Sequence, residues 1–110
     1  FDKIANARSA LMFASLPAAA DFKTILFCIQ NAVDVMVKGA IEKNEIAVPG
    51  VPTLAQRLAE ALEMGVEIQC CTQTMANKKI TAEALIPQAN LAGAMNLIDL
   101  IAKADGTLCF

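Results

Sequence analysis

The stretch Thr53–Cys71, TLAQRLAEALEMGVEIQCC, predicts a helix and a strand that are joined by a single glycine. Its first part, Thr53–Met64, has an N-capping threonine and an apolar stripe at helical spacing, made by Leu54, Leu58, Ala61 and Leu62. Gly65 ends this helix, and Val66–Cys71 follows at once as a strand. A helix that leads directly into a short apolar strand is typical of a parallel α/β sheet.

The segments on either side continue this alternation. Lys23–Gln30, KTILFCIQ, is a near-continuous apolar run, which predicts a strand buried on both faces. Asp2–Ala20 has helical periodicity, and Pro17 should kink this helix or end it early. The other expected elements are a short helix over Val33–Lys38 closed by Gly39, a loop over Lys43–Pro52, a helix over Thr72–Lys79, a turn at Thr81–Leu85, a strand within Pro87–Gly93, a helix over Asn96–Ala104 with Leu97, Leu100, Ile101 and Ala104 facing inward, and a last strand over Gly106–Phe110. We therefore expect residues 1–110 to form one α/β domain, with a parallel sheet between two layers of helices.

Composition narrows the function classes. Hydrophobic residues make up 56% of the 110 residues and charged residues 18%, so the chain must bury a large apolar surface, for which other copies of itself are a natural outlet. The net charge is −2, and Lys78-Lys79 is the only local basic pair, which argues against nucleic acid as a partner. Histidine is absent, which excludes His-assisted nucleophiles and the commonest metal ligand.

The sequence favours a cytoplasmic protein. No stretch reaches the ~18–20 continuous apolar residues that a membrane helix needs. Ala10–Phe22 resembles the apolar region of a signal peptide. We do not expect a signal peptide here, because Arg8 and Ser9 interrupt the apolar run and the start at Phe1 implies that upstream residues are absent. The four cysteines lack the regular spacing of a disulfide framework, which is typical of reduced thiols.

Cys71 is the strongest candidate for chemistry. Side chains alternate along Val66–Cys71, so Cys70 shares a face with apolar residues and Cys71 shares the other face with Glu67 and Gln69. Cys71 is also the last residue of the strand, where α/β folds place ligand crevices. The helix that opens at Thr72 offers free N–H groups that would lower the thiol pKa from ~8.5, and Lys78 and Lys79 would add positive charge if they fold back.

Position alone leaves Cys71 evenly balanced between a reactive thiol and a buried small hydrophobe. Cys28 is clearly structural, whereas Cys109 is less clearly so because it lies near the end of an expected strand. A Cys70–Cys71 disulfide would be strained, and no CxxC motif is present. The residues expected to line a pocket around Cys71 are Thr72, Thr74, Met75 and Gly93.

Several segments together carry a family resemblance. They are GVEIQCCTQTM (Gly65–Met75), KITAEALI (Lys79–Ile86), ANLAGAMNLIDLIAKAD (Ala89–Asp105), TLCF (Thr107–Phe110) and, nearer the start, KTILFCIQNAVDVMVKG (Lys23–Gly39). Their order and spacing resemble the DsrE/DsrF-like family of small sulfur-relay proteins, over almost the whole chain. The family's first strand, which should precede the opening helix, is missing here, so the sheet should lack a strand next to Lys23–Gln30.

The resemblance implies a fold, an assembly and an activity. The fold is a three-layer α/β/α domain with a five-stranded parallel sheet, and the assembly is a homotrimer or hexamer. The activity is that of a sulfur carrier or sulfurtransferase, in which the cysteine matching Cys71 accepts sulfane sulfur as a persulfide and passes it to a partner, such as another sulfur-relay protein. Neither metal nor organic cofactor is implied. Two alternatives stay open: a non-catalytic module that binds a small anion or nucleotide, and a structural subunit of an oligomeric assembly.

Overall fold

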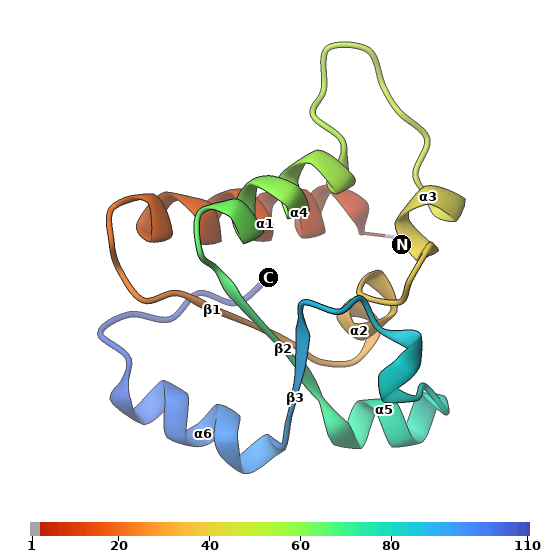
Figure 1. Cartoon of the computed structure of the whole chain (residues 1–110). Helices are drawn as coiled ribbons and strands as arrows, with labels where there is room; N and C mark the ends of the chain where they lie inside the picture. The colour runs from red at the N-terminus through yellow and green to blue at the C-terminus, as the bar shows by residue number, and fades with distance from the viewer. Residues whose placement is uncertain (1–2) are drawn as a thin grey trace.

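Three parallel strands form the centre of the computed structural model, which describes residues 3–110 (Figure 1). They are β1 (Ile25–Cys28), β2 (Glu67–Cys71) and β3 (Ala89–Ala92), and they lie in the order β1-β2-β3. Both pairings are parallel, with Cys28 opposite Cys70 and Cys71 opposite Ala92. The predicted α/β fold with a parallel sheet is confirmed.

Helices lie on both sides of this sheet (Figure 1). The long helices α1 (Ile4–Ala19) and α4 (Leu54–Glu63) pack against each other on one side, and α6 (Ala94–Lys103) lies on the other. The shorter helices are α2 (Asn31–Val35), α3 (Ala40–Asn44), α5 (Thr72–Lys78) and the 3₁₀ turn η1 (Ala82–Ala84). Because α5 starts directly where β2 ends, its first turn lies at the carboxyl edge of the sheet.

The core fills the space between the sheet and the α1–α4 layer. Leu11 of α1, Leu54 of α4 and Ile68 of β2 are almost completely buried there. Burying side chains of this size contributes ~1.5–3 kcal/mol each. Cys28 and Cys70 belong to this core cluster, whereas Cys71 does not.

The start of α4 is held from two directions. Thr53 and Gln56 form a capping box, in which the Gln56 N–H donates to the Thr53 hydroxyl and the Thr53 N–H donates to the Gln56 side chain. The buried Glu45 carboxylate accepts from the Leu54 N–H at 2.7 Å and also receives the Arg8 guanidinium at 3.4 Å. At the other end, Gly65 has a φ of +94°, the left-handed conformation that favours glycine at a helix end.

Three predictions for the first half of the chain need correction. Helix α1 continues past Pro17 to Ala19, because a proline so close to the helix end interrupts few backbone bonds; the predicted start at Asp2 lies outside the described residues. The helix expected over Val33–Lys38 begins and ends earlier, as α2, because Val37 pairs with Leu85 in an antiparallel bridge. Gly39 then precedes α3 instead of closing a helix, so the expected loop begins only after Asn44.

The C-terminal predictions also differ from the structure. The expected strand over Gly106–Phe110 is wrong: this segment pairs with no strand and is exposed, although the Phe110 ring lies 5.8 Å from that of Phe13. Residues 3–110 therefore form a three-stranded sheet, not the five strands that the resemblance implied, and β1 is an edge strand.

The helix expected over Asn96–Ala104 is present as α6, but its apolar side chains are less buried than predicted. It begins at Ala94, two residues earlier than predicted, and none of its residues is buried. Leu97 and Leu100 are half-buried, whereas Ile101 and Ala104 are exposed, because α6 has the sheet on one side and no further layer of the chain beyond it. No helix within residues 3–110 combines the length and apolar character required to cross a membrane.

Candidate functional site

Cys71 ends β2 and is the N-cap residue of α5. Its side chain is 5% exposed and lies on the opposite face of the sheet from Cys70, which is fully buried in the core. This separation follows from the alternation of side chains along a strand. Cys71 is thus the one β2 thiol that faces away from the α1–α4 layer.

The first turn of α5 favours the thiolate form of Cys71. The Thr74 N–H has the largest effect, and the Thr74 hydroxyl and the Gln73 N–H add to it, so the pKa of Cys71 lies below its usual range even though burial opposes this. The Cys71 side chain does not form a capping hydrogen bond.

The two lysines expected near the thiol have other roles. The Lys78 ammonium donates to the Asn31 amide oxygen and to the Asp34 carboxylate, both at 3.1 Å. Lys79 is the C-cap of α5 and has a left-handed backbone. Neither lysine is among the groups that shift the pKa of Cys71. Backbone N–H groups and the Thr74 hydroxyl lower this pKa, and lysine charges do not contribute.

Cys71 opens onto a groove of about 250 Å³ at the carboxyl edge of the sheet. One wall is apolar and consists of Phe27, Ile29, Ala94 and Leu97. The rest is polar but uncharged and consists of Gln30, Gln73, Thr74 and Asn77. The buried Thr74 hydroxyl accepts a hydrogen bond from the Gln30 N–H at 3.1 Å, which ties the end of β1 to α5.

Only Thr74 among the four predicted pocket residues lines this groove. The prediction that Met75 lines the pocket is wrong. Met75 is 5% exposed and belongs to the core, because one step along a helix from Thr74 turns the side chain by about 100°. Thr72 and Gly93 lie beside each other, since a Cβ placed at Gly93 would be 4.0 Å from the Thr72 hydroxyl, but neither is part of the lining. The other lining residues lie on β1, on the two residues that follow it, on α5 and on α6, and a single sequence carries no local signal that these segments converge.

The other three cysteines lie in different settings from Cys71: Cys28 and Cys70 are buried in the core, and Cys109 lies outside any helix or strand. Cys28 is buried opposite Cys70, and its contact with the Cys70 sulfur, together with burial, raises the pKa of Cys28 far above its usual range. The pKa of Cys70 is lowered by the Cys28 thiol, but Cys70 has no exposed surface. Cys109 is exposed and lies in the irregular C-terminal segment, not near the end of a strand as predicted.

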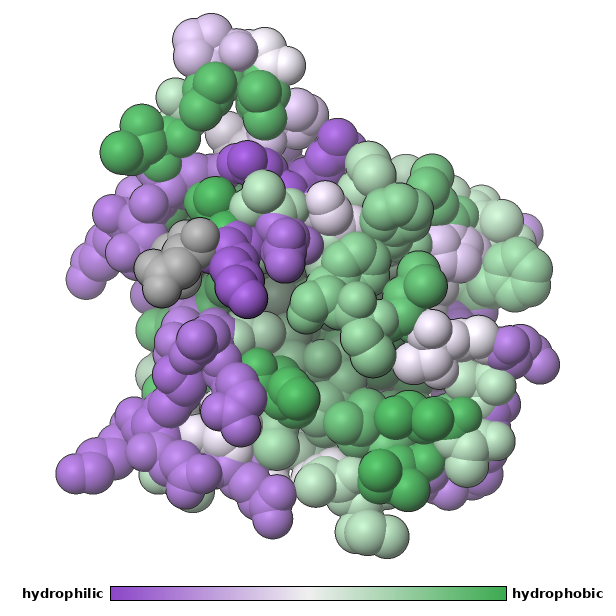
Figure 2. Space-filling view, turned by 180° about the vertical axis from the view of Figure 1, so that it is seen from behind, coloured by the Kyte–Doolittle hydropathy of each residue, from purple (hydrophilic) through white to green (hydrophobic). Residues whose placement is uncertain are grey.

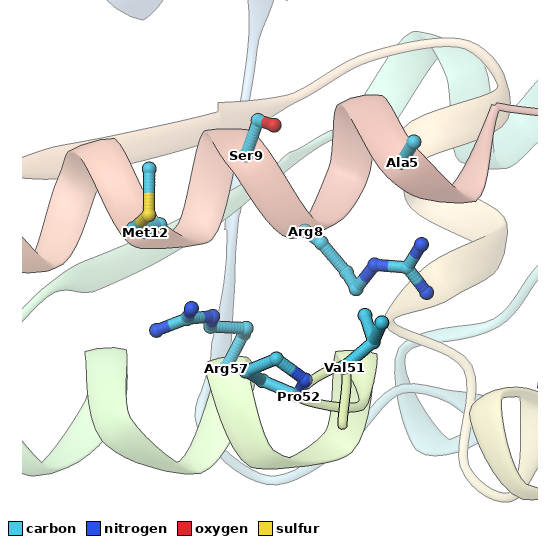
Figure 3. A pocket seen from close by; sticks show the side chains of 7 residues that line it. All are labelled: Ala5, Arg8, Ser9, Met12, Val51, Pro52 and Arg57. Atoms are coloured by element: carbon cyan, nitrogen blue, oxygen red, sulfur yellow. The ribbon is translucent and has the colours of Figure 1, made fainter. Parts of the chain in front are cut away.

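A second hollow of about 200 Å³ lies between α1 and α4 (Figure 3). Arg8 and Ser9 of α1 and Arg57 of α4 contribute its polar groups. Both guanidinium groups already have carboxylate partners, Glu45 at 3.4 Å and Glu60 at 3.2 Å. Its lining contains no cysteine and no carboxylate, so the Ser9 hydroxyl has no general base in the lining that could activate it. Across residues 3–110, no group of three or more Cys, Asp or Glu side chains is placed to hold a metal ion.

A parallel α/β domain with a thiol at the carboxyl edge of its sheet is the class that this fold and site define. The chain belongs to the DsrE/DsrF-like family, whose sequence profile matches residues 3–110. Its fold is similar to that in the crystal structure of the ychN protein from E. coli, with a TM-score of 0.70 and 18% identity over 94% of this chain and 82% of that one. No curated protein matches the sequence.

Proposed function

We propose that this protein is a sulfur carrier, which binds sulfane sulfur as a persulfide on Cys71 and passes it to a partner. The observation that carries this proposal is the setting of Cys71: its thiol opens onto a groove and has a lowered pKa, whereas Cys28 and Cys70 lie in the core. Membership of a family linked to sulfur relay supports the same function. Other sulfur-relay proteins are the partners that we propose.

The chemistry needs only the Cys71 thiolate and two exchange steps. The thiolate attacks the outer sulfur of a persulfide, and the donor leaves as a thiolate. An acceptor thiolate then attacks the terminal sulfur on Cys71 and regenerates the resting thiolate. The N–H groups at the start of α5 favour the anionic sulfur at both stages.

Alkylation tests whether Cys71 is the reactive thiol. The protein is treated with iodoacetamide at mildly acidic pH, and labelled cysteines are mapped by mass spectrometry. We expect Cys71 to be labelled before Cys28, Cys70 and Cys109, because the thiolate is the nucleophile. Equal labelling of all four cysteines, or no labelling of Cys71, would count against the carrier function.

Persulfide loading tests the function itself. Incubation with polysulfide should add the mass of one sulfur atom to Cys71, and Cys71→Ser should abolish this adduct while Cys109→Ser retains it. A binding module would instead show stabilisation by an anion or nucleotide that survives Cys71→Ser. A structural subunit would show neither result.

We also propose that the chain assembles with copies of itself, as a trimer or hexamer. Large hydrophobic side chains are exposed on α1, on α6 and in the C-terminal segment, among them Phe13, Ile98 and Leu108. Figure 2 shows an extended apolar area across one face of the molecule. Monomeric soluble proteins rarely expose apolar areas of this kind.

A further inference from the structure

The groove beside Cys71 offers no charged side chain to a bound molecule. Its apolar wall combines Phe27 of β1 and Ile29, which directly follows β1, with Ala94 and Leu97 of α6. The opposite wall consists of the amides of Gln30, Gln73 and Asn77 and the Thr74 hydroxyl. Amides and hydroxyls bind uncharged polar groups well but cannot balance a net charge.

The nearest cation along α5 is already paired. Lys78 follows Asn77 directly, but its ammonium contacts Asn31 and the Asp34 carboxylate, each at 3.1 Å. Its positive charge is thus offset by a carboxylate and is not offered to the groove. A compact sulfur oxyanion such as thiosulfate would lose hydration here without gaining the Arg or Lys contacts that usually repay this loss.

We propose that this groove binds the part of the donor next to the transferred sulfur, and that it selects an organic persulfide with an uncharged R group over a sulfur oxyanion. This inference rests on the proposed carrier function. The Cys71 thiolate attacks the outer sulfur of R–S–S–H, so a new S–S bond forms on Cys71 while the donor S–S bond breaks. The electron pair of that bond leaves on R–S⁻, and the proton stays on the transferred sulfur. One thiolate is consumed and one released, so the step needs neither oxidant nor reductant.

Two alkylating reagents of different charge test the groove without any sulfur transfer. Neutral iodoacetamide and anionic iodoacetate are compared at Cys71 by rate measurements with mass spectrometry, and exposed Cys109 of the same chain serves as the reference. We expect the iodoacetamide-to-iodoacetate rate ratio to be at least threefold higher at Cys71 than at Cys109. Equal ratios at the two cysteines would overturn the proposal.

A charge placed in the groove provides the matched comparison. Asn77→Lys should lower the ratio at Cys71 by roughly three- to eightfold, the effect of one unit charge several ångströms away in a water-like dielectric, because Asn77 is exposed to solvent. Gln88→Lys adds the same charge next to the amino end of β3, at an exposed position, and should change the ratio less than twofold. Gln73→Lys is a second groove variant and should act like Asn77→Lys. Equal effects of the Gln88 and Asn77 variants would show a general charge effect and overturn the proposal.

Donors then separate this inference from the carrier function. Asn77→Lys should increase persulfide loading of Cys71 from thiosulfate by a factor similar to the alkylation effect, and leave loading from a persulfide with an uncharged alkyl group within twofold of wild type. If no donor loads Cys71 while the alkylation ratios hold, the carrier function fails and the charge selectivity of the groove stands. If Asn77→Lys leaves loading from thiosulfate unchanged, the donor selectivity is wrong even though Cys71 carries sulfur.

Discussion

Cys70 and Cys71 are neighbours in the chain but occupy opposite faces of the sheet. We predict that Cys70→Ser lowers the free energy of unfolding by ~1–3 kcal/mol, because it places a hydroxyl in an apolar core. Cys71→Ser should cost less than about 1 kcal/mol, because its side chain faces a partly polar groove. Urea denaturation of the two variants measures both changes. Equal losses would contradict the assignment of the two thiols to different faces.

The lowered pKa of Cys71 predicts a pH dependence of stability. A thiol whose pKa is lower in the folded state than in the unfolded state adds stability that is fully present above the unfolded pKa of ~8.5. This contribution is lost as the pH falls through the folded pKa. The difference in unfolding free energy between wild type and Cys71→Ser should therefore grow in favour of wild type as the pH rises through that window. Denaturation at a series of pH values checks this, and a difference that does not change with pH would contradict it.

The features of the site that follow from local sequence could be predicted, whereas those that depend on contacts between distant segments could not. Strand alternation places Cys71 away from Cys70, and the first turn of α5 follows from position alone. The prediction that Met75 lines the pocket was wrong, and Lys78 does not fold back toward Cys71. Both positions depend on distant partners: the core beneath α5 for Met75, and Asp34 on α2 for Lys78. The groove itself joins β1, α5 and α6, and a single sequence does not show which of these segments converge.

At the scale of elements, helix α4 depends on a residue nine positions before its start. The buried Glu45 carboxylate accepts from the Leu54 N–H at 2.7 Å and contacts the Arg8 guanidinium at 3.4 Å. We predict that Glu45→Ala lowers the free energy of unfolding by ~1–3 kcal/mol, because it leaves a helix N–H without its acceptor and Arg8 without its partner. Urea denaturation measures the loss. Glu42→Ala, at an exposed position on α3, is the control and should change little; similar losses for both variants would show that the Glu45 contacts add no stability.

The predicted elements were most accurate where the signals are local. Thr53 caps α4 as predicted, and β2, α5 and β3 lie within one or two residues of their expected bounds. The bridge between Val37 and Leu85 could not be predicted, because it joins residues 48 positions apart. The Gly106–Phe110 strand was wrong for a related reason: an apolar segment becomes a strand only when it lies alongside another strand, and this segment pairs with neither edge strand, β1 or β3.

At the scale of the whole molecule, the two faces of the sheet are covered to different extents. The α1–α4 layer covers a buried core, whereas α6 on the other side has no buried residue. Three of its large side chains are strongly exposed: Met95 at 77%, Ile98 at 57% and Ile101 at 46%. At about 25 cal/mol per Å², an apolar helix face of this kind gains substantially from burial against another surface.

Self-association through α6 is the prediction that follows from this exposed face. Ile98→Glu should lower the average molar mass of the protein, because burying an unpaired carboxylate in an apolar interface is strongly unfavourable. Sedimentation equilibrium over a range of protein concentrations measures this, with Ala59→Glu, which adds the same charge at an exposed position on α4, as the control. We expect wild type and Ala59→Glu to sediment as the same oligomer and Ile98→Glu as a smaller species. A wild-type protein that is monomeric at every concentration would rule out the proposed assembly. If all three proteins form the same oligomer, the interface does not involve the exposed face of α6.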